Sequence, residues 1–247
     1  MIDTHAHLTA LDDADEAIER AAEAGVTRIL TVGTDVEDCR RALSLAEQHD
    51  GVFAILGIHP HEAGTAGEND LAELRELLAH PKAVAVGETG LDWYRDHAPR
   101  DDQRSLFAGQ LELAAELGKP AVIHTRAADD DTLAGLEGFT GTVVLHCFSS
   151  PHMLPTAFER GWYVSFAGNA TFPKAVDLRL AASQVPAERV FAETDSPYLA
   201  PQPVRGKRNE PANVVHTLAV LARARAEEPA ELERQIERNA AECFGLP

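Results

Sequence analysis

Short apolar segments alternate with longer amphipathic segments along the whole chain. We count eight apolar, partly β-branched runs, at residues 1–5, 28–33, 52–58, 83–87, 120–124, 142–146, 162–166 and 189–193. Most of these runs are nearly continuous in hydrophobicity, which is typical of parallel strands covered on both faces. The pattern therefore predicts eight parallel strands.

The segments between these runs have helical periodicity. Apolar residues recur every three or four positions in 12–24, 70–79 and 101–117, and the residues after Ala230 predict a further C-terminal helix. Eight strand–helix repeats in 247 residues favour a closed barrel over an open sheet. We therefore expect an α/β fold, a (β/α)8 TIM barrel with an extra C-terminal helix, built as a single domain over residues 1–247.

The composition is that of an ordinary globular domain. Apolar residues make up 45% and charged residues 25%, and no apolar run is long enough to predict a membrane span. The scattered Cys39, Cys147 and Cys243 indicate reduced thiols and a cytoplasmic protein. A signal peptide is not expected, because its removal would take the histidines near the N-terminus with it.

The charge balance is strongly acidic. Forty acidic residues outnumber 22 basic residues, for a formal net charge of −18. This charge argues against a broad basic surface for nucleic acid. It does not exclude a phosphate substrate, because divalent ions would make a pocket locally positive inside an acidic protein.

Side chains that bind metal ions fall where the predicted strands end. His5 and His7 alternate with Ala6, so both point to the same side of the first strand. Further candidates stand at the ends of later strands: His59, His61, Glu88, His124, His146 and Asp195. Barrel enzymes build their active sites at these carboxyl-terminal strand ends, so we expect the candidates to converge.

Within these candidates, four imidazoles and two carboxylates suit two divalent metal ions: His5, His7, His124, His146, Glu88 and Asp195. We predict His5, His7 and Asp195 on one ion, and His124 and His146 on the other, with Glu88 and a solvent hydroxide bridging them. These nitrogen and oxygen ligands tolerate Mg²⁺, Mn²⁺ or Zn²⁺.

The same residues lie in motifs that resemble the TatD family of metal-dependent deoxyribonucleases, within the amidohydrolase-like barrels. Seven motifs follow in order, at residues 3–7, 57–61, 87–92, 123–126, 146–148, 193–197 and 205–211. The resemblance covers essentially the whole chain and implies a (β/α)8 barrel, two divalent ions and phosphodiester hydrolysis, often from the 3′ end of single strands. The six predicted ligands match the ligand positions of the family one by one.

For catalysis we predict attack of the bridging hydroxide on phosphorus, with Glu88 and Asp195 as the catalytic carboxylates and Asp195 taking the proton. Candidate phosphate-binding residues are His59, His61, Arg126, Arg205, Lys207 and Arg208. Arg126 is the favoured bidentate clamp, because it lies two residues beyond His124 on the same strand face.

Structural roles compete with some of these assignments. Hydrogen bonds alone could hold the turn around His59 and His61, and the basic residues after the eighth strand could be solvated. Asp92, like Asp3, more readily orients a histidine than binds a metal. Trp93 and Tyr94 could stack on a base, although packing beneath their loop is favoured.

Three functions remain open at this point. The favoured one is a 3′–5′ exonuclease acting on DNA, with single strands as the expected substrate. The alternatives are a dinuclear hydrolase of small amides, lactones or phosphotriesters, and a non-catalytic metal-binding protein. Glu88 stands where many small-molecule hydrolases have a carboxylated Lys, which favours the nuclease. No membrane partner is expected, and a monomer is slightly favoured.

Overall fold

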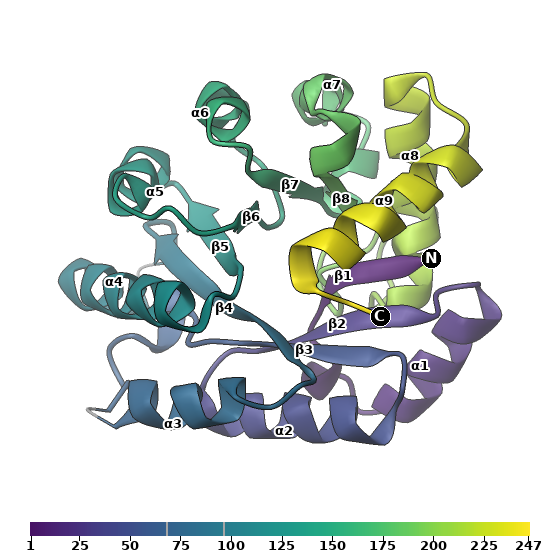
Figure 1. The fold of residues 1–247 in the computed structure, drawn as a ribbon. Helices are drawn as coiled ribbons and strands as arrows, with labels where there is room; N and C mark the ends of the chain where they lie inside the picture. The colour runs from purple at the N-terminus through teal and green to yellow at the C-terminus, as the bar shows by residue number, and fades with distance from the viewer. Residues whose placement is uncertain (68, 96) are drawn as a thin grey trace. The chain divides into compact units, whose positions relative to one another are not determined.

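The computed structural model describes residues 1–67, 69–95 and 97–247. Strands occupy Ile2–Ala6 (β1), Arg28–Gly33 (β2), Val52–Leu56 (β3), Ala83–Asp92 (β4), Ala121–Arg126 (β5), Val143–Leu145 (β6), Tyr163–Phe166 (β7) and Val190–Ala192 (β8). Figure 1 labels them in chain order, and β3 to β6 are neighbours in the sheet in that order. The eight predicted strands and the (β/α)8 fold class are confirmed.

Helices alternate with these strands. They span Ala14–Glu23 (α1), Val36–Gln48 (α2), Asp70–Leu78 (α3), Arg100–Leu117 (α4), Asp129–Leu136 (α5), Leu154–Glu159 (α6), Val176–Gln184 (α7), Val214–Arg225 (α8) and Pro229–Phe244 (α9). The predicted helices correspond to α1, α3 and α4, and α9 is the expected extra C-terminal helix. None of the helices in the described ranges combines the length and apolarity that crossing a membrane requires.

Strand β4 is longer than the sequence pattern predicts. The apolar run ends at Gly87, but the backbone stays extended as far as Asp92 and pairs in parallel with β5, with Gly90 opposite His124. A Cβ atom on Gly90 would lie 2.0 Å from the His124 carbonyl oxygen, so only glycine fits this close approach. Glu88 consequently lies within the strand, and not after it as we expected.

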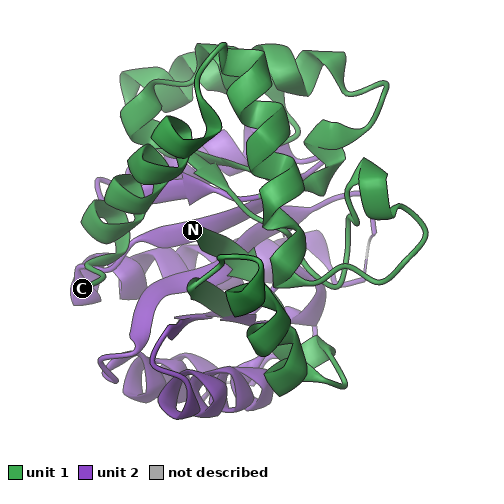
Figure 2. Cartoon of the chain, turned by 90° about the vertical axis from the view of Figure 1, so that its right-hand side faces the viewer, with its two compact units in different colours: residues 1–31, 147–247 green, residues 32–146 purple. Residues whose placement is uncertain are grey.

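The chain divides into two compact units, residues 1–31 with 147–247 (unit 1) and residues 32–146 (unit 2), coloured separately in Figure 2. A single domain over residues 1–247 therefore stays a prediction. In unit 1, β1 pairs in parallel with β2, and β7 with β8. Helix α9 packs on β8, where the Phe191 ring stacks at 4.9 Å on Tyr163 and at 5.6 Å on Phe244.

In unit 2, buried glutamines of α4 brace the ends of two strands. The Gln110 side chain exchanges hydrogen bonds of 2.8 and 2.9 Å with the backbone N–H and carbonyl of Ile58, and donates to the Thr89 hydroxyl at 2.7 Å. Gln103 accepts a 2.9 Å hydrogen bond from the backbone N–H of Asp92. Buried polar groups satisfied in this way hold the strand ends in one arrangement.

Candidate metal centre

In unit 2, one buried carboxylate oxygen faces three imidazoles. The Oε1 atom of Glu88 lies 2.6 Å from His124 Nδ1, 3.4 Å from His146 Nε2 and 3.5 Å from His59 Nε2. Candidate ligand atoms of His59, Glu88 and His124 all lie within 4.8 Å of one another. Imidazole nitrogens and a carboxylate oxygen this close together are a donor set that fits a divalent metal ion.

Asp92, the last residue of β4, supports this cluster through both oxygens. Its Oδ2 atom lies 3.2 Å from His124 Nε2 and 2.9 Å from His61 Nε2, while Oδ1 accepts 2.8 Å hydrogen bonds from the backbone N–H groups of Tyr94 and Arg95. Burial raises the pKa of Asp92, but the hydrogen bonds, that from His124 first among them, lower it well below its usual range. The carboxylate is therefore ionised and holds the His124 ring in a fixed orientation, as histidine ligands commonly require.

Two of the histidines that face Glu88, His124 and His59, have pKa values shifted in opposite directions. Burial lowers the pKa of His124, but its contacts with Asp92 and Glu88 raise the pKa to about 9. Burial lowers the pKa of His59 to about 4, against the attraction of Glu88. A neutral imidazole is the form that binds metal, so His59 is ready to bind and a metal at His124 displaces a proton.

The turn after β3 holds both predicted phosphate-binding histidines. His59 Nδ1 accepts a 3.1 Å hydrogen bond from the His61 backbone N–H, and the two rings contact edge to face at 4.2 Å. Hydrogen bonding within the turn, which was the structural alternative for these two histidines, is therefore present. The structure also places His59 beside Glu88, among the candidate metal ligands.

In unit 1, the His-x-His pair meets the segment that follows β8. The His5 and His7 rings lie 5.1 Å apart, and His7 Nε2 is 3.4 Å from Asp195 Oδ1. The His5 carbonyl accepts a 2.9 Å hydrogen bond from the Asp195 N–H, and the His7 N–H donates to the Ser196 carbonyl at 2.7 Å. Main-chain contacts thus bring together the three residues that we predicted to share an ion.

The Asp3 side chain also holds β1 to the segment that follows β8. Its buried carboxylate accepts hydrogen bonds of 2.9 and 2.5 Å from the N–H and hydroxyl of Thr194, and one of 3.3 Å from the His5 N–H. Burial raises the pKa of Asp3 to about 8. Asp3 therefore positions His5 through its backbone N–H, in line with the expectation that it orients a histidine.

Sequence reasoning assigned no role to two buried polar residues of unit 1. Glu193 accepts hydrogen bonds from the Cys147 N–H at 2.7 Å and the Ser165 hydroxyl at 2.5 Å. Asn209 donates to the carbonyls of Thr194 at 2.9 Å and Tyr198 at 2.6 Å. Glu193 and Asn209 both lie within the seven motifs. An asparagine in a loop that contains several prolines could have indicated that its side chain holds the loop by hydrogen bonds.

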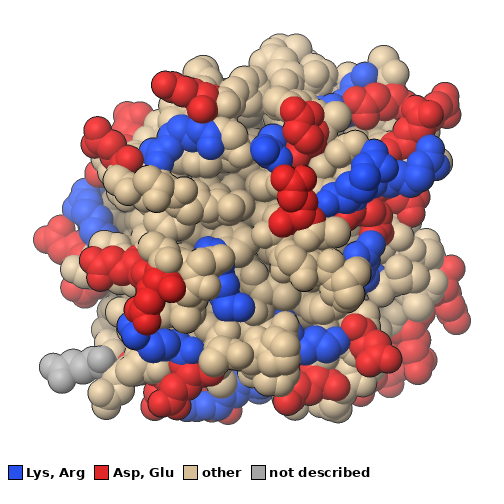
Figure 3. Space-filling view, in the orientation of Figure 1, with Lys and Arg blue, Asp and Glu red and all other residues tan. Residues whose placement is uncertain are grey.

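The predicted phosphate-binding cations lie in different surroundings. Arg208 pairs with Asp12 at 3.3 Å and with Asp13, whereas the Arg205 guanidinium lies 4.2 Å from the centre of the Phe172 ring. Lys207 is exposed in the same loop. Figure 3 shows Lys and Arg interspersed with Asp and Glu on the face that it draws, in keeping with an acidic chain that has no broad basic surface there.

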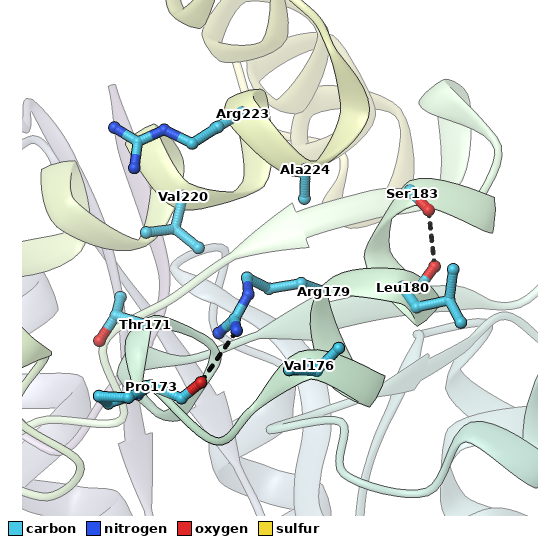
Figure 4. Close-up of a pocket in the computed structure, with 9 residues that line it drawn as sticks. All are labelled: Thr171, Pro173, Val176, Arg179, Leu180, Ser183, Val220, Arg223 and Ala224. Atoms are coloured by element: carbon cyan, nitrogen blue, oxygen red, sulfur yellow. Dashed lines mark hydrogen bonds between the residues drawn. The ribbon is translucent and has the colours of Figure 1, made fainter.

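A separate cavity of about 570 Å³ lies in unit 1, beside α7 and α8 (Figure 4). Its lining residues are Thr171, Pro173, Val176, Arg179, Leu180, Ser183, Val220, Arg223 and Ala224. Arg179 donates hydrogen bonds to the carbonyls of Ala170, Phe172 and Pro173, so it braces the preceding turn. None of the candidate metal ligands lines this cavity.

A (β/α)8 fold with imidazole–carboxylate clusters at its strand ends defines a metal-dependent hydrolase. Within that class the chain belongs to the TatD related DNase family, whose model matches residues 2–245. The resemblance inferred from the seven motifs is thereby confirmed.

Two relatives match the chain over its full length. An uncharacterized metal-dependent hydrolase TatD of Mycobacterium tuberculosis is 42% identical, over 100% of this chain and 98% of the relative. A protein of Erwinia billingiae named 3′-5′ ssDNA/RNA exonuclease TatD is 36% identical over 100% of both chains. Among solved structures, YJJV, a TatD homolog from Escherichia coli K12, has a TM-score of 0.94 and 30% identity, covering 100% of this chain and 98% of the other.

Proposed function

We propose that this metal-dependent hydrolase cleaves phosphodiester bonds of single-stranded DNA from the 3′ end. The observation that carries the proposal is the Glu88 carboxylate facing the imidazoles of His59, His124 and His146. Relatives named 3′-5′ ssDNA/RNA exonuclease, such as that of Erwinia billingiae, support the choice of substrate. Other relatives carry only the name of metal-dependent hydrolase.

Two sets of residues are proposed to hold divalent ions. Glu88, His124 and His146 form one set, to which the structure suggests adding His59, and His5, His7 and Asp195 form the other. That Glu88 belongs to both ions is an inference from the sequence. Bound Mg²⁺, Mn²⁺ or Zn²⁺ would supply Lewis acidity towards phosphoryl oxygens and lower the pKa of water.

The residues of the chain orient the reacting groups. Asp92 fixes the His124 ring, so that Nδ1 is directed towards Glu88. Asp195, whose carboxylate lies beside His7, is the proposed proton acceptor. Arg126, exposed at the end of β5, is the proposed phosphate clamp. Arg205 and Lys207 remain candidates for further phosphate contacts, whereas Arg208 is already paired with two carboxylates.

The test uses a 5′-labelled single-stranded oligonucleotide with Mg²⁺ or Mn²⁺. We expect a ladder that shortens from the 3′ end, disappears with EDTA and is lost in Glu88→Gln. Glu47→Gln, an exposed acid beside His80, is the matched control and should keep full activity. A circular single strand has no 3′ end and should stay intact.

An intact linear strand with every metal would contradict the proposed substrate. Turnover of a lactone or an aryl ester under the same conditions would instead support a small-molecule hydrolase. Metal binding without turnover of any of these substrates would support the non-catalytic alternative.

A further inference from the structure

Two neighbouring aromatic residues after β4 have different environments. The Trp93 indole donates a 2.8 Å hydrogen bond to Asp131, and the guanidinium groups of Arg100 and Arg104 lie 4.7 and 5.1 Å from its ring centre. Tyr94 is 64% exposed, which is unusual for a large aromatic side chain. The Trp93 ring therefore packs against residues of α4 and α5, whereas the Tyr94 ring is exposed.

A cation lies on the Tyr94 ring. The Arg126 guanidinium is 4.1 Å from the ring centre and Arg95 is 5.9 Å away, both within cation–π range. Among the described residues, Arg126 forms no ion pair with a carboxylate, whereas arginines such as Arg40 and Arg75 do pair with acids. A guanidinium with no acid beside it among the described residues is notable in a chain of net charge −18.

Short contacts tie this Tyr94–Arg126 pair to the candidate metal centre of unit 2. The Asp92 carboxylate holds His124 with one oxygen and the Tyr94 N–H with the other. The backbone N–H of Trp93 donates a 2.9 Å hydrogen bond to the Arg126 carbonyl, and Asp92 lies opposite Arg126 in the sheet. Each member of the pair thus lies two residues beyond a residue of the metal cluster, on a backbone held by hydrogen bonds.

We propose that Tyr94 and Arg126 bind one nucleotide of a single strand, the ring stacking on the base and the guanidinium donating to a phosphate. The inference rests on the proposed function and specifies how the substrate is held. A stacking face accepts any base that is unpaired and unstacked, so the pair selects single strands over duplexes without selecting a sequence. The adjacent cation suits the phosphate that accompanies every base.

Binding can be measured without turnover by fluorescence anisotropy, using a labelled single strand with phosphorothioate linkages that resist cleavage. Stacking on one aromatic residue predicts that Tyr94→Ala weakens binding roughly 5-fold to 150-fold, while Tyr94→Phe binds as the wild type does. Phe158→Ala, a change at an exposed aromatic residue of α6, is the matched control and should change nothing. Thermal melting of each variant checks that it is folded.

The two members of the pair give different signatures. Arg126→Ala should lower the slope of log affinity against log salt by about 0.7, because one phosphate contact is lost, whereas Tyr94→Ala should leave the slope unchanged. A strand with an abasic residue at the bound position should bind the wild type more weakly. For Tyr94→Ala, the abasic strand and the intact strand should bind equally, because the aromatic ring that would stack on the base is already absent.

Equal binding by folded Tyr94→Ala and Tyr94→Phe would overturn the inference, as would an equal abasic penalty in wild type and Tyr94→Ala. Failure of the wild type to bind any single strand would overturn it together with the proposed substrate. Binding that depends on Tyr94 without any cleavage would overturn the proposed activity alone.

Discussion

Asp92 shows how one side chain can determine the geometry of a whole cluster. We expect Asp92→Asn to lower metal affinity roughly 10-fold to 100-fold, because a neutral amide holds the His124 N–H less firmly than a carboxylate does. Isothermal titration with Mn²⁺ or Zn²⁺ measures this loss. Asp101→Asn, at an exposed residue that pairs with Arg104, is the control, and equal affinities in the two variants would refute this role of Asp92.

A second prediction at this scale concerns Tyr163 and alkaline pH. Burial raises the pKa of its hydroxyl to about 12, while the unfolded chain ionises it near its usual value of 10. Between these values the unfolded state has lost its proton and the folded state has kept it, so the free energy of unfolding falls as pH rises. The fall should not exceed about 2.7 kcal/mol, at 1.36 kcal/mol for each pH unit.

Urea titrations at pH 9 and pH 11 measure the first half of this loss, about 1.4 kcal/mol. Tyr163→Phe should lose less stability over the same interval, because it has no proton to release. It should be less stable at pH 9, where the 3.0 Å hydrogen bond from Arg189 is missing. Parallel pH profiles in the two proteins would be evidence against the assignment.

At the residue level, the sequence predicts which side chains gather better than it predicts what each one does. His124 and Glu88 could be foreseen as neighbours, since parallel strands end at one edge of a sheet. The double role of Asp92 and the anchoring by Asn209 could not, because they depend on contacts between backbone groups distant in the chain.

At the level of elements, continuous apolar runs located all eight strands, because buried parallel strands need apolar side chains on both faces. The pattern was wrong for the end of β4. Residues after Gly87 are polar or small, yet pairing with β5 keeps them extended. A hydrophobic pattern identifies strand residues that are buried among apolar side chains. The end of β4 that carries the candidate ligands has polar neighbours, so the pattern does not identify it.

The loop between β8 and α8 depends on one buried asparagine. Asn209→Ala removes two hydrogen bonds to carbonyls and leaves those carbonyls unsatisfied, so we expect the free energy of unfolding to fall by about 1–3 kcal/mol. Urea denaturation measures the loss. Asn69→Ala, at an exposed position with no side-chain capping bond, should change stability by less than about 0.5 kcal/mol. A similar loss in both variants would argue against an anchor at Asn209.

For the molecule as a whole, the excess of acids has a consequence for stability. The 40 acidic residues outnumber the 22 basic residues, so their charges repel one another, and some of these acids, such as Glu88, are buried in the candidate centres. Divalent ions that bind only the folded chain would stabilise it. A free concentration 100 times the dissociation constant contributes about 2.7 kcal/mol at one site.

For a chain of this size, such a gain should raise the melting temperature by roughly 5–10 °C, at about 2–4 °C per kcal/mol. Differential scanning calorimetry with Mn²⁺, followed by EDTA, measures the shift and its reversal. Sodium chloride at equal ionic strength controls for general screening. In Glu88→Gln the shift should be much smaller, while Glu47→Gln should keep it. An equal shift in both variants would mean that the ions act on surface charge and not at the centre around Glu88.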